Sequence, residues 1–188
     1  MKPVRLLQLL IILLVAAGHC LVSAALPPVS TYNAYSNKSY NFQMKYPTAW
    51  DVEEGVMGTA VFFLSPLSGP GDEFRENVNI IIEDVSAHPG LTADDYEAVS
   101  IDELARTITD FTVIERGRRI VSGRPARTLE FTGTQGMYQI RFLQVYAVSA
   151  GRAFVITYTA EDSQYQRYLP AVTRMIDTLS LQGVGSRV

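Results

Sequence analysis

The sequence predicts an α+β domain in which two amphipathic helices pack on a twisted antiparallel sheet. Two observations lead to this fold class. About seven segments alternate apolar and polar residues with the period of a β-strand, and glycine-containing turns separate them at hairpin spacing. Two further segments carry apolar residues with helical period. The chain contains no internal repeat, which favours a single domain.

The first strands are expected around Pro47. Phe42, Met44 and Tyr46 alternate with polar residues, Pro47 ends the run, and the pattern restarts at Trp50 after a short turn, which predicts a β-hairpin. The later strands are predicted at Thr59–Leu64, Val78–Val85, Phe111–Glu115, Arg118–Ser122, Arg127–Thr132, Met137–Ser149 and Ala153–Thr159.

Two helices are expected between and after these strands. Thr92 followed by Asp95 is typical of a capping box, and Tyr96 begins the apolar stripe of the first helix. The second helix is predicted to begin near Ser163. Pro170 lies in its pattern and either opens the main helix after a preceding turn or kinks a longer one, and the sequence does not decide between these.

The N-terminal segment has the pattern of an export signal. Lys2 and Arg5 precede the apolar run 9–17, and small residues end at Ala24, where we expect cleavage. Acylation of Cys20, as in bacterial lipoproteins, is the alternative, but His19 fits poorly in the position before the modified cysteine. We therefore expect a signal peptide at 1–24, a linker at 25–39, the domain at 40–182 and a flexible tail at 183–188.

Size and charge limit the function. The 188 residues are 47% hydrophobic and 19% charged, so the chain can bury a core. Two of the 16 basic residues lie in the leader, which leaves 14 against 19 acidic residues, a net charge of about −5. This acidity argues against nucleic acid as a partner.

Catalysis has few candidate residues in the mature chain. Cleavage at Ala24 leaves no cysteine and one histidine, His88, so a serine–histidine mechanism would depend on a residue in a predicted turn. The chain has no Gly-x-Ser-x-Gly motif. We therefore expect no enzyme activity and no catalytic residue.

Acidic residues give two candidate metal sites, and calcium is the candidate ion because it prefers oxygen ligands. One site is the loop with Asp72, Glu73 and Glu76, although Arg75 lies among them and the EF-hand spacing is absent. The other would join His88 to carboxylates from both sides, namely Asp84, Asp94 and Asp95. A solvated loop and the first turn of a helix explain the same residues without a metal.

Five arginines fall within twelve residues on two predicted strands and their turn: Arg116, Arg118, Arg119, Arg124 and Arg127. In an acidic protein such a cluster is a candidate docking patch for an anionic partner or for lipid headgroups. Protection of a sheet edge by exposed charge is the structural alternative.

Four segments, in this order, resemble the PsbP-like family, whose founding members are extrinsic lumenal proteins of photosystem II. The segments are Tyr40-Asn41-Phe42-Gln43-Met44-Lys45-Tyr46-Pro47 with Trp50, Val121–Ala126 with Leu129-Glu130-Phe131, Arg152–Ala160, and Tyr165 to Leu179 with its Tyr168-Leu169-Pro170. The resemblance runs from Tyr40 to Leu181. It implies an α-β-α sandwich without catalytic activity, acting as an accessory or assembly subunit on the outer face of a membrane complex.

The expected partner is therefore a membrane protein complex, which in a photosynthetic host is photosystem II. We expect the protein to be located in the periplasm, in the thylakoid lumen or outside the cell. We also expect it to be a monomer that is peripheral to the membrane. The resemblance also implies calcium or chloride retention, but no matched pair of metal ligands carries over to this sequence. The alternative function is a carrier of a small ligand, a lipid or a divalent ion such as calcium, held between the sheet and a helix.

Overall fold

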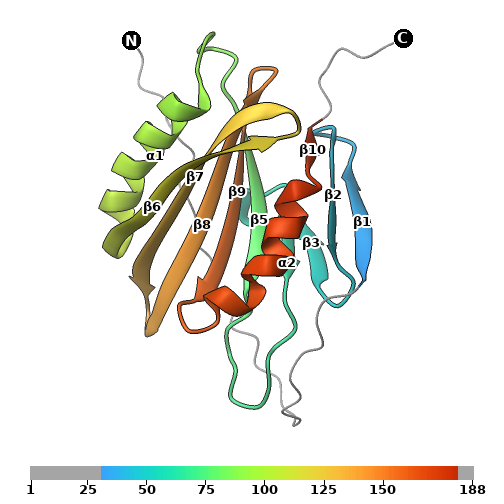
Figure 1. Cartoon of the computed structure of the whole chain (residues 1–188), viewed down its shortest axis with the longest axis vertical. Coiled ribbons are helices and arrows are strands. Elements are labelled where there is room, and N and C mark those ends of the chain that lie inside the picture. The colour runs from blue at the N-terminus through green and yellow to red at the C-terminus, as the bar shows by residue number, and fades with distance from the viewer. Residues whose placement is uncertain (1–30, 182–188) are drawn as a thin grey trace.

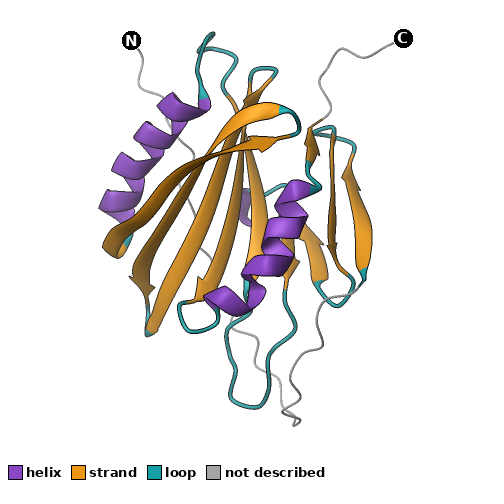
Figure 2. Ribbon diagram, viewed as in Figure 1, coloured by secondary structure: helices purple, strands orange, loops and turns teal. Residues whose placement is uncertain are grey.

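The computed structural model describes residues 31–181, which form two antiparallel sheets and two helices (Figures 1 and 2). The large sheet has seven strands in the order β3-β4-β5-β9-β8-β7-β6, and the small sheet has three in the order β1-β2-β10. The large sheet contains β3 (Asp51–Glu54), β4 (Val61–Leu64), β5 (Asn77–Asp84), β6 (Thr109–Val121), β7 (Arg124–Gln135), β8 (Tyr138–Ser149) and β9 (Arg152–Glu161). The small sheet contains β1 (Tyr32–Asn37), β2 (Phe42–Pro47) and β10 (Ser180–Leu181), and the helices are α1 (Ala93–Thr107) and α2 (Tyr165–Asp177). The predicted α+β fold class is confirmed.

Each face of the large sheet has its own apolar core. Helix α1 covers one face, where Phe142 and Tyr146 of β8 contribute to a core with Tyr96 and Leu104. Helix α2 and the small sheet cover the other face, and their core includes Val145 from the same strand. Strand β8 serves both cores because successive side chains of a strand point to opposite faces.

Local signals place α1 as expected. Thr92 Oγ1 accepts a hydrogen bond from the Asp95 backbone N–H, and the Asp95 side chain accepts one from the Thr92 N–H, so the predicted capping box is present. In α2, Pro170 lies inside the helix rather than opening it. The described residues include no helix that is long and apolar enough to cross a bilayer.

The structure corrects the predicted start of the domain. Tyr32–Asn37 forms strand β1, so residues expected to be linker belong to the small sheet. The predicted hairpin around Pro47 is also wrong, because β2 pairs with β1 and β10 whereas β3 pairs with β4 in the large sheet. Ala24, Cys20 and the tail 183–188 lie outside the described residues.

The predicted strands Phe111–Glu115 and Arg118–Ser122 are one strand, β6. Gly117, which separates the two predicted strands in the sequence, pairs with Thr128 in the middle of this strand. A Cβ atom at Gly117 would lie 2.5 Å from Thr128 Oγ1, so glycine permits a close cross-strand contact there.

Candidate interaction surface

The arginine-bearing segment is a hairpin at the edge of the large sheet. Strands β6 and β7 are joined by Ser122 and Gly123, whose φ angles of 51° and 74° fit the tight turn that joins twisted antiparallel strands. Strand β6 pairs with β7 on one side and ends the sheet on the other. The hairpin therefore presents a sheet edge and parts of two faces.

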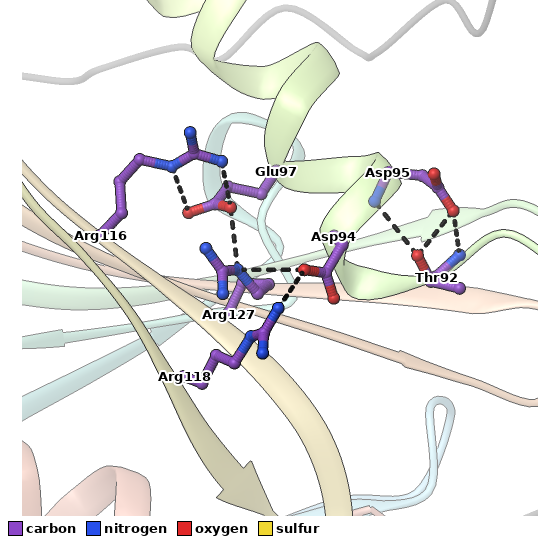
Figure 3. A network of polar contacts seen from close by, with 7 residues as sticks. All are labelled: Thr92, Asp94, Asp95, Glu97, Arg116, Arg118 and Arg127. Carbon is purple, nitrogen blue, oxygen red and sulfur yellow. Dashed lines mark hydrogen bonds and ion pairs between the residues drawn. The ribbon is translucent and has the colours of Figure 1, made fainter.

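On the α1 side, the hairpin surrounds a buried carboxylate (Figure 3). The Glu97 side chain is 1% exposed, and it accepts hydrogen bonds from Arg116 Nη2 at 2.8 Å and Arg127 Nε at 2.9 Å. Arg127 is itself largely buried, whereas half of the Arg116 side chain is exposed. The hydrogen bonds that Arg116 donates to Glu97 raise the pKa of Arg116. Two arginines facing one carboxylate leave a net positive charge at this position.

Arg118 is the most exposed arginine of this group. Its side chain is 79% exposed and its Nη2 lies 3.5 Å from Asp94 Oδ1 in the first turn of α1. Asp94 also faces Arg127 at 3.7 Å. The α1 side of the hairpin thus holds three of the five predicted arginines, Arg116, Arg118 and Arg127, beside two carboxylates (Figure 3).

The other two arginines lie on the α2 side. Arg119 Nη2 donates to Asp177 Oδ1 of α2 at 2.6 Å. Arg124 Nη1 donates to the carbonyl oxygens of Ser122 and Leu181, which ties the hairpin turn to β10. The five arginines do not form one patch, because alternate residues of each strand point to opposite faces.

The role of Glu97 as a buried ion-pair partner was not predicted from the sequence. It lies on the buried side of α1 together with Ala93, Ser100 and Leu104. A charged residue at this spacing on an apolar stripe is a signal of a buried ion pair, since carboxylates are almost never fully buried without a partner.

The acidic loop between β4 and β5 holds the other predicted site. Asp72 accepts hydrogen bonds from the backbone N–H groups of Ser68 and Phe74, so both of its oxygens shape the loop. Glu76 is fully buried; its Oε2 accepts from Ser65 Oγ at 3.2 Å, and its Oε1 has no hydrogen-bond partner in the described structure. Burial, helped by the charges of Asp72 and Glu161, raises the pKa of Glu76 to about 7. Glu73, the remaining carboxylate of the predicted site, is exposed.

The structure does not bring His88 to this loop. His88 lies in the segment between β5 and α1, at the opposite end of the large sheet from the loop between β4 and β5 (Figure 1). Among its other proposed partners, Asp84 accepts from the Ser86 N–H, Asp95 caps α1 and Asp94 faces the arginines. Residues 31–181 contain no group of three His, Cys, Asp or Glu side chains arranged for a metal ion. The geometry therefore does not favour calcium at either predicted site.

Comparison with known proteins assigns the fold and the family. The chain has the fold of cyanobacterial PsbP from Synechocystis, with a TM-score of 0.61 at 17% identity over 86% of this chain and 99% of that one. It is similar to protein PA94 of unknown function from Pseudomonas aeruginosa, a putative regulator by its description, with a TM-score of 0.59 at 18% identity over 81% and 99% of the two chains. LpqN of Mycobacterium tuberculosis, described as involved in cell envelope biogenesis, has a TM-score of 0.56 at 13% identity over 80% and 90%.

These identities establish a shared fold and no shared activity. The family model of PsbP matches residues 30–181. The chain therefore belongs to the PsbP family, as the four segments predicted. No curated protein matches the sequence.

Proposed function

We propose that this protein is a non-enzymatic, exported accessory or assembly factor that docks on the outer face of a membrane protein complex. Membership of the PsbP family supports this class of role. The N-terminal pattern of positive charge, apolar run and small residues supports export. In a photosynthetic host the complex would be photosystem II, and in another host a different periplasmic or secreted partner takes its place.

The docking surface is the α1 side of the β6–β7 hairpin, and one observation carries this proposal. The Arg116 and Arg118 side chains are 49% and 79% exposed. Glu97 of α1 holds Arg116 through hydrogen bonds, and Asp94 of α1 lies 3.5 Å from Arg118. A held arginine loses less side-chain entropy on binding than a free one. The rest of the mature chain is acidic, so this cationic site would orient the protein toward an anionic surface on its partner.

The test is recovery of the protein from host membranes. Arg118→Glu should lower the recovered amount severalfold, because it reverses an exposed charge without removing a ligand of Glu97. Arg106→Glu, an exposed reversal in the last turn of α1, is the matched control and should bind as the wild type does. Equal recovery of Arg118→Glu and wild type would exclude this surface.

The carrier function is a weaker second candidate, supported only by the buried and unpartnered Glu76 Oε1. The surroundings do not fit a calcium ion, because the Asp72 oxygens already accept from the backbone and Glu73 is exposed. Calorimetric titration with calcium should therefore give the same heat for the wild type and for Glu76→Gln. A calcium-dependent signal lost in Glu76→Gln would favour the carrier function instead.

A further inference from the structure

Strand β6 is an open edge that carries charged residues and two register shifts, one of them between Val113 and Glu115, but neither feature covers its backbone. It is 13 residues long, it ends the seven-stranded sheet, and no described segment pairs with its outer side. Natural edges are commonly short or carry lysine or proline, and β6 contains neither residue type. Ile114 and Ile120 on this strand are 45% and 65% exposed. Such an edge can receive another strand through its backbone N–H and C=O groups.

Glu115 lacks a cationic partner on this edge. It is exposed, and within residues 31–181 it forms no ion pair. Its cross-strand neighbour in the sheet is Glu130, a like charge whose carboxylate binds Arg141. A second strand beside β6 that placed a cation opposite Glu115 would relieve this repulsion.

The strand itself carries such a cation at the matching position. Arg119 lies four residues after Glu115 and on the same face of the strand. Arg119 contacts Asp177 of α2, and Glu115 pairs with Glu130 on the α2 side of the sheet. A fifth of the Arg119 side chain stays exposed beside Asp177. In an antiparallel pair of identical strands centred on Gly117, Glu115 of each copy is opposite Arg119 of the other.

We propose that two copies of this chain associate through antiparallel pairing of their β6 strands, centred on Gly117. Ile114 lies in the register shift between Val113 and Glu115, so the regular pairing is expected over Glu115 to Arg119. The nearest other registers that keep side chains on matching faces are centred on Arg116 or on Arg118. Each of them places the central arginine opposite the same arginine of the other copy. In both, Glu115 has no cation opposite it. Charge thus selects one register for a continuous sheet through both copies. This dimer differs from the monomer expected from the sequence.

The same register sets Arg116 opposite Arg118 on the α1 face, which is unfavourable between free charges. Each keeps its acidic partner, Glu97 or Asp94, so the repulsion is reduced. The two-fold axis is perpendicular to the sheet, so both α1 faces lie on one side and their arginines are adjacent. The association is therefore expected to be reversible, and it does not depend on the proposed docking function.

A charge-exchange experiment tests the register. Sedimentation velocity of the purified wild type should show a dimer that grows with concentration. Glu115→Arg alone opposes arginine to arginine twice, and Arg119→Glu alone opposes glutamate to glutamate twice, so each should dimerise at least about tenfold more weakly. A mixture of the two variants restores both opposite-charge pairs and should form a heterodimer at wild-type concentrations.

The controls separate folding and docking from dimerisation. Asp102→Arg, an exposed reversal on α1, should leave the dimer unchanged. Arg118→Glu should strengthen the dimer by placing an acid opposite Arg116, although it weakens membrane docking. If Arg119→Glu fails to fold beside Asp177, the loss of self-association in Glu115→Arg, with unchanged circular dichroism, still tests the proposal. A wild type that stays monomeric, a dimer insensitive to Glu115→Arg, or a folded mixture that does not associate would overturn it.

Discussion

Arg127 Nε lies 2.9 Å from Glu97 Oε2, and both side chains are almost completely buried where α1 meets the hairpin. The pair joins a helix to a strand that follows 30 residues later. Because Arg116 reaches the same carboxylate from the neighbouring strand, one acidic side chain fixes the helix against both strands of the hairpin.

Glu97→Gln should destabilise the protein by about 3 kcal/mol, because it leaves the largely buried Arg127 with only the exposed Asp94, 3.7 Å away, as an anionic partner. Urea denaturation followed by circular dichroism measures this loss. Asp94→Asn is the control: Asp94 is 60% exposed and its contacts are 3.5 Å or longer, so the change should cost less than about 1 kcal/mol. Equal effects of the two substitutions would show that burial of Glu97 does not matter.

Glu76 should make stability depend on pH. Its folded-state pKa of about 7 lies above its ordinary value of 4.5, so the folded protein holds the proton more tightly than the unfolded chain does. The corresponding stability is fully present below about pH 4.5 and is lost as pH rises to about 7, by up to about 3 kcal/mol. Glu76→Gln mimics the protonated form, so its advantage over the wild type in urea denaturation should grow across this interval. Exposed Glu73→Gln should show no such trend, and a pH-independent Glu76→Gln difference would contradict the prediction.

Gly133→Ala should destabilise the protein by about 1–3 kcal/mol through a steric clash. A Cβ atom there would lie 2.2 Å from Ile108 Cγ2 and 3.1 Å from the Thr109 carbonyl oxygen. Thermal unfolding of Gly133→Ala, Ile108→Ala and the double variant measures the coupling. The double variant should be more stable than the sum of the single effects predicts, and simple additivity would mean that the clash is absent.

Thr92→Ala should cost about 1 kcal/mol, because it removes the hydroxyl that accepts from the Asp95 N–H at the start of α1. The hydroxyl also donates to the Asp95 carboxylate and thereby lowers the pKa of Asp95. Chemical denaturation should place Thr92→Ser close to the wild type, since serine keeps the hydroxyl. A serine variant as unstable as the alanine variant would point to the lost methyl group instead.

Local patterns determined which parts could be predicted from sequence. The capping box at Thr92 and strands β4, β5, β8 and β9 depend on neighbouring residues, so they were predicted close to their observed positions. The partner of β2 was not, because the alternation of Phe42 and Met44 indicates a buried face without specifying which strand pairs alongside.

The distribution of the arginines over two faces was not predicted for a related reason. Arg118 and Arg119 are neighbours in sequence and lie on opposite faces of β6, which their odd and even positions could have indicated. The role of Glu97 was hidden because its partners follow 19 and 30 residues later on two strands. The contact of Glu97 with its two arginine partners depends on how α1 packs on the sheet, and no local sequence pattern specifies this packing.

The small sheet has a consequence for how the chain is made. Its central strand β2 is flanked by β1, which begins at Tyr32, and by β10, which ends at Leu181, so both ends of the described chain must be present to complete it. During synthesis from the N to the C terminus, Phe42 and Met44 stay incompletely covered until β10 has been made. We therefore expect the protein to fold slowly and to be sensitive to truncation near Leu181, because β10 must pair with the distant strand β2.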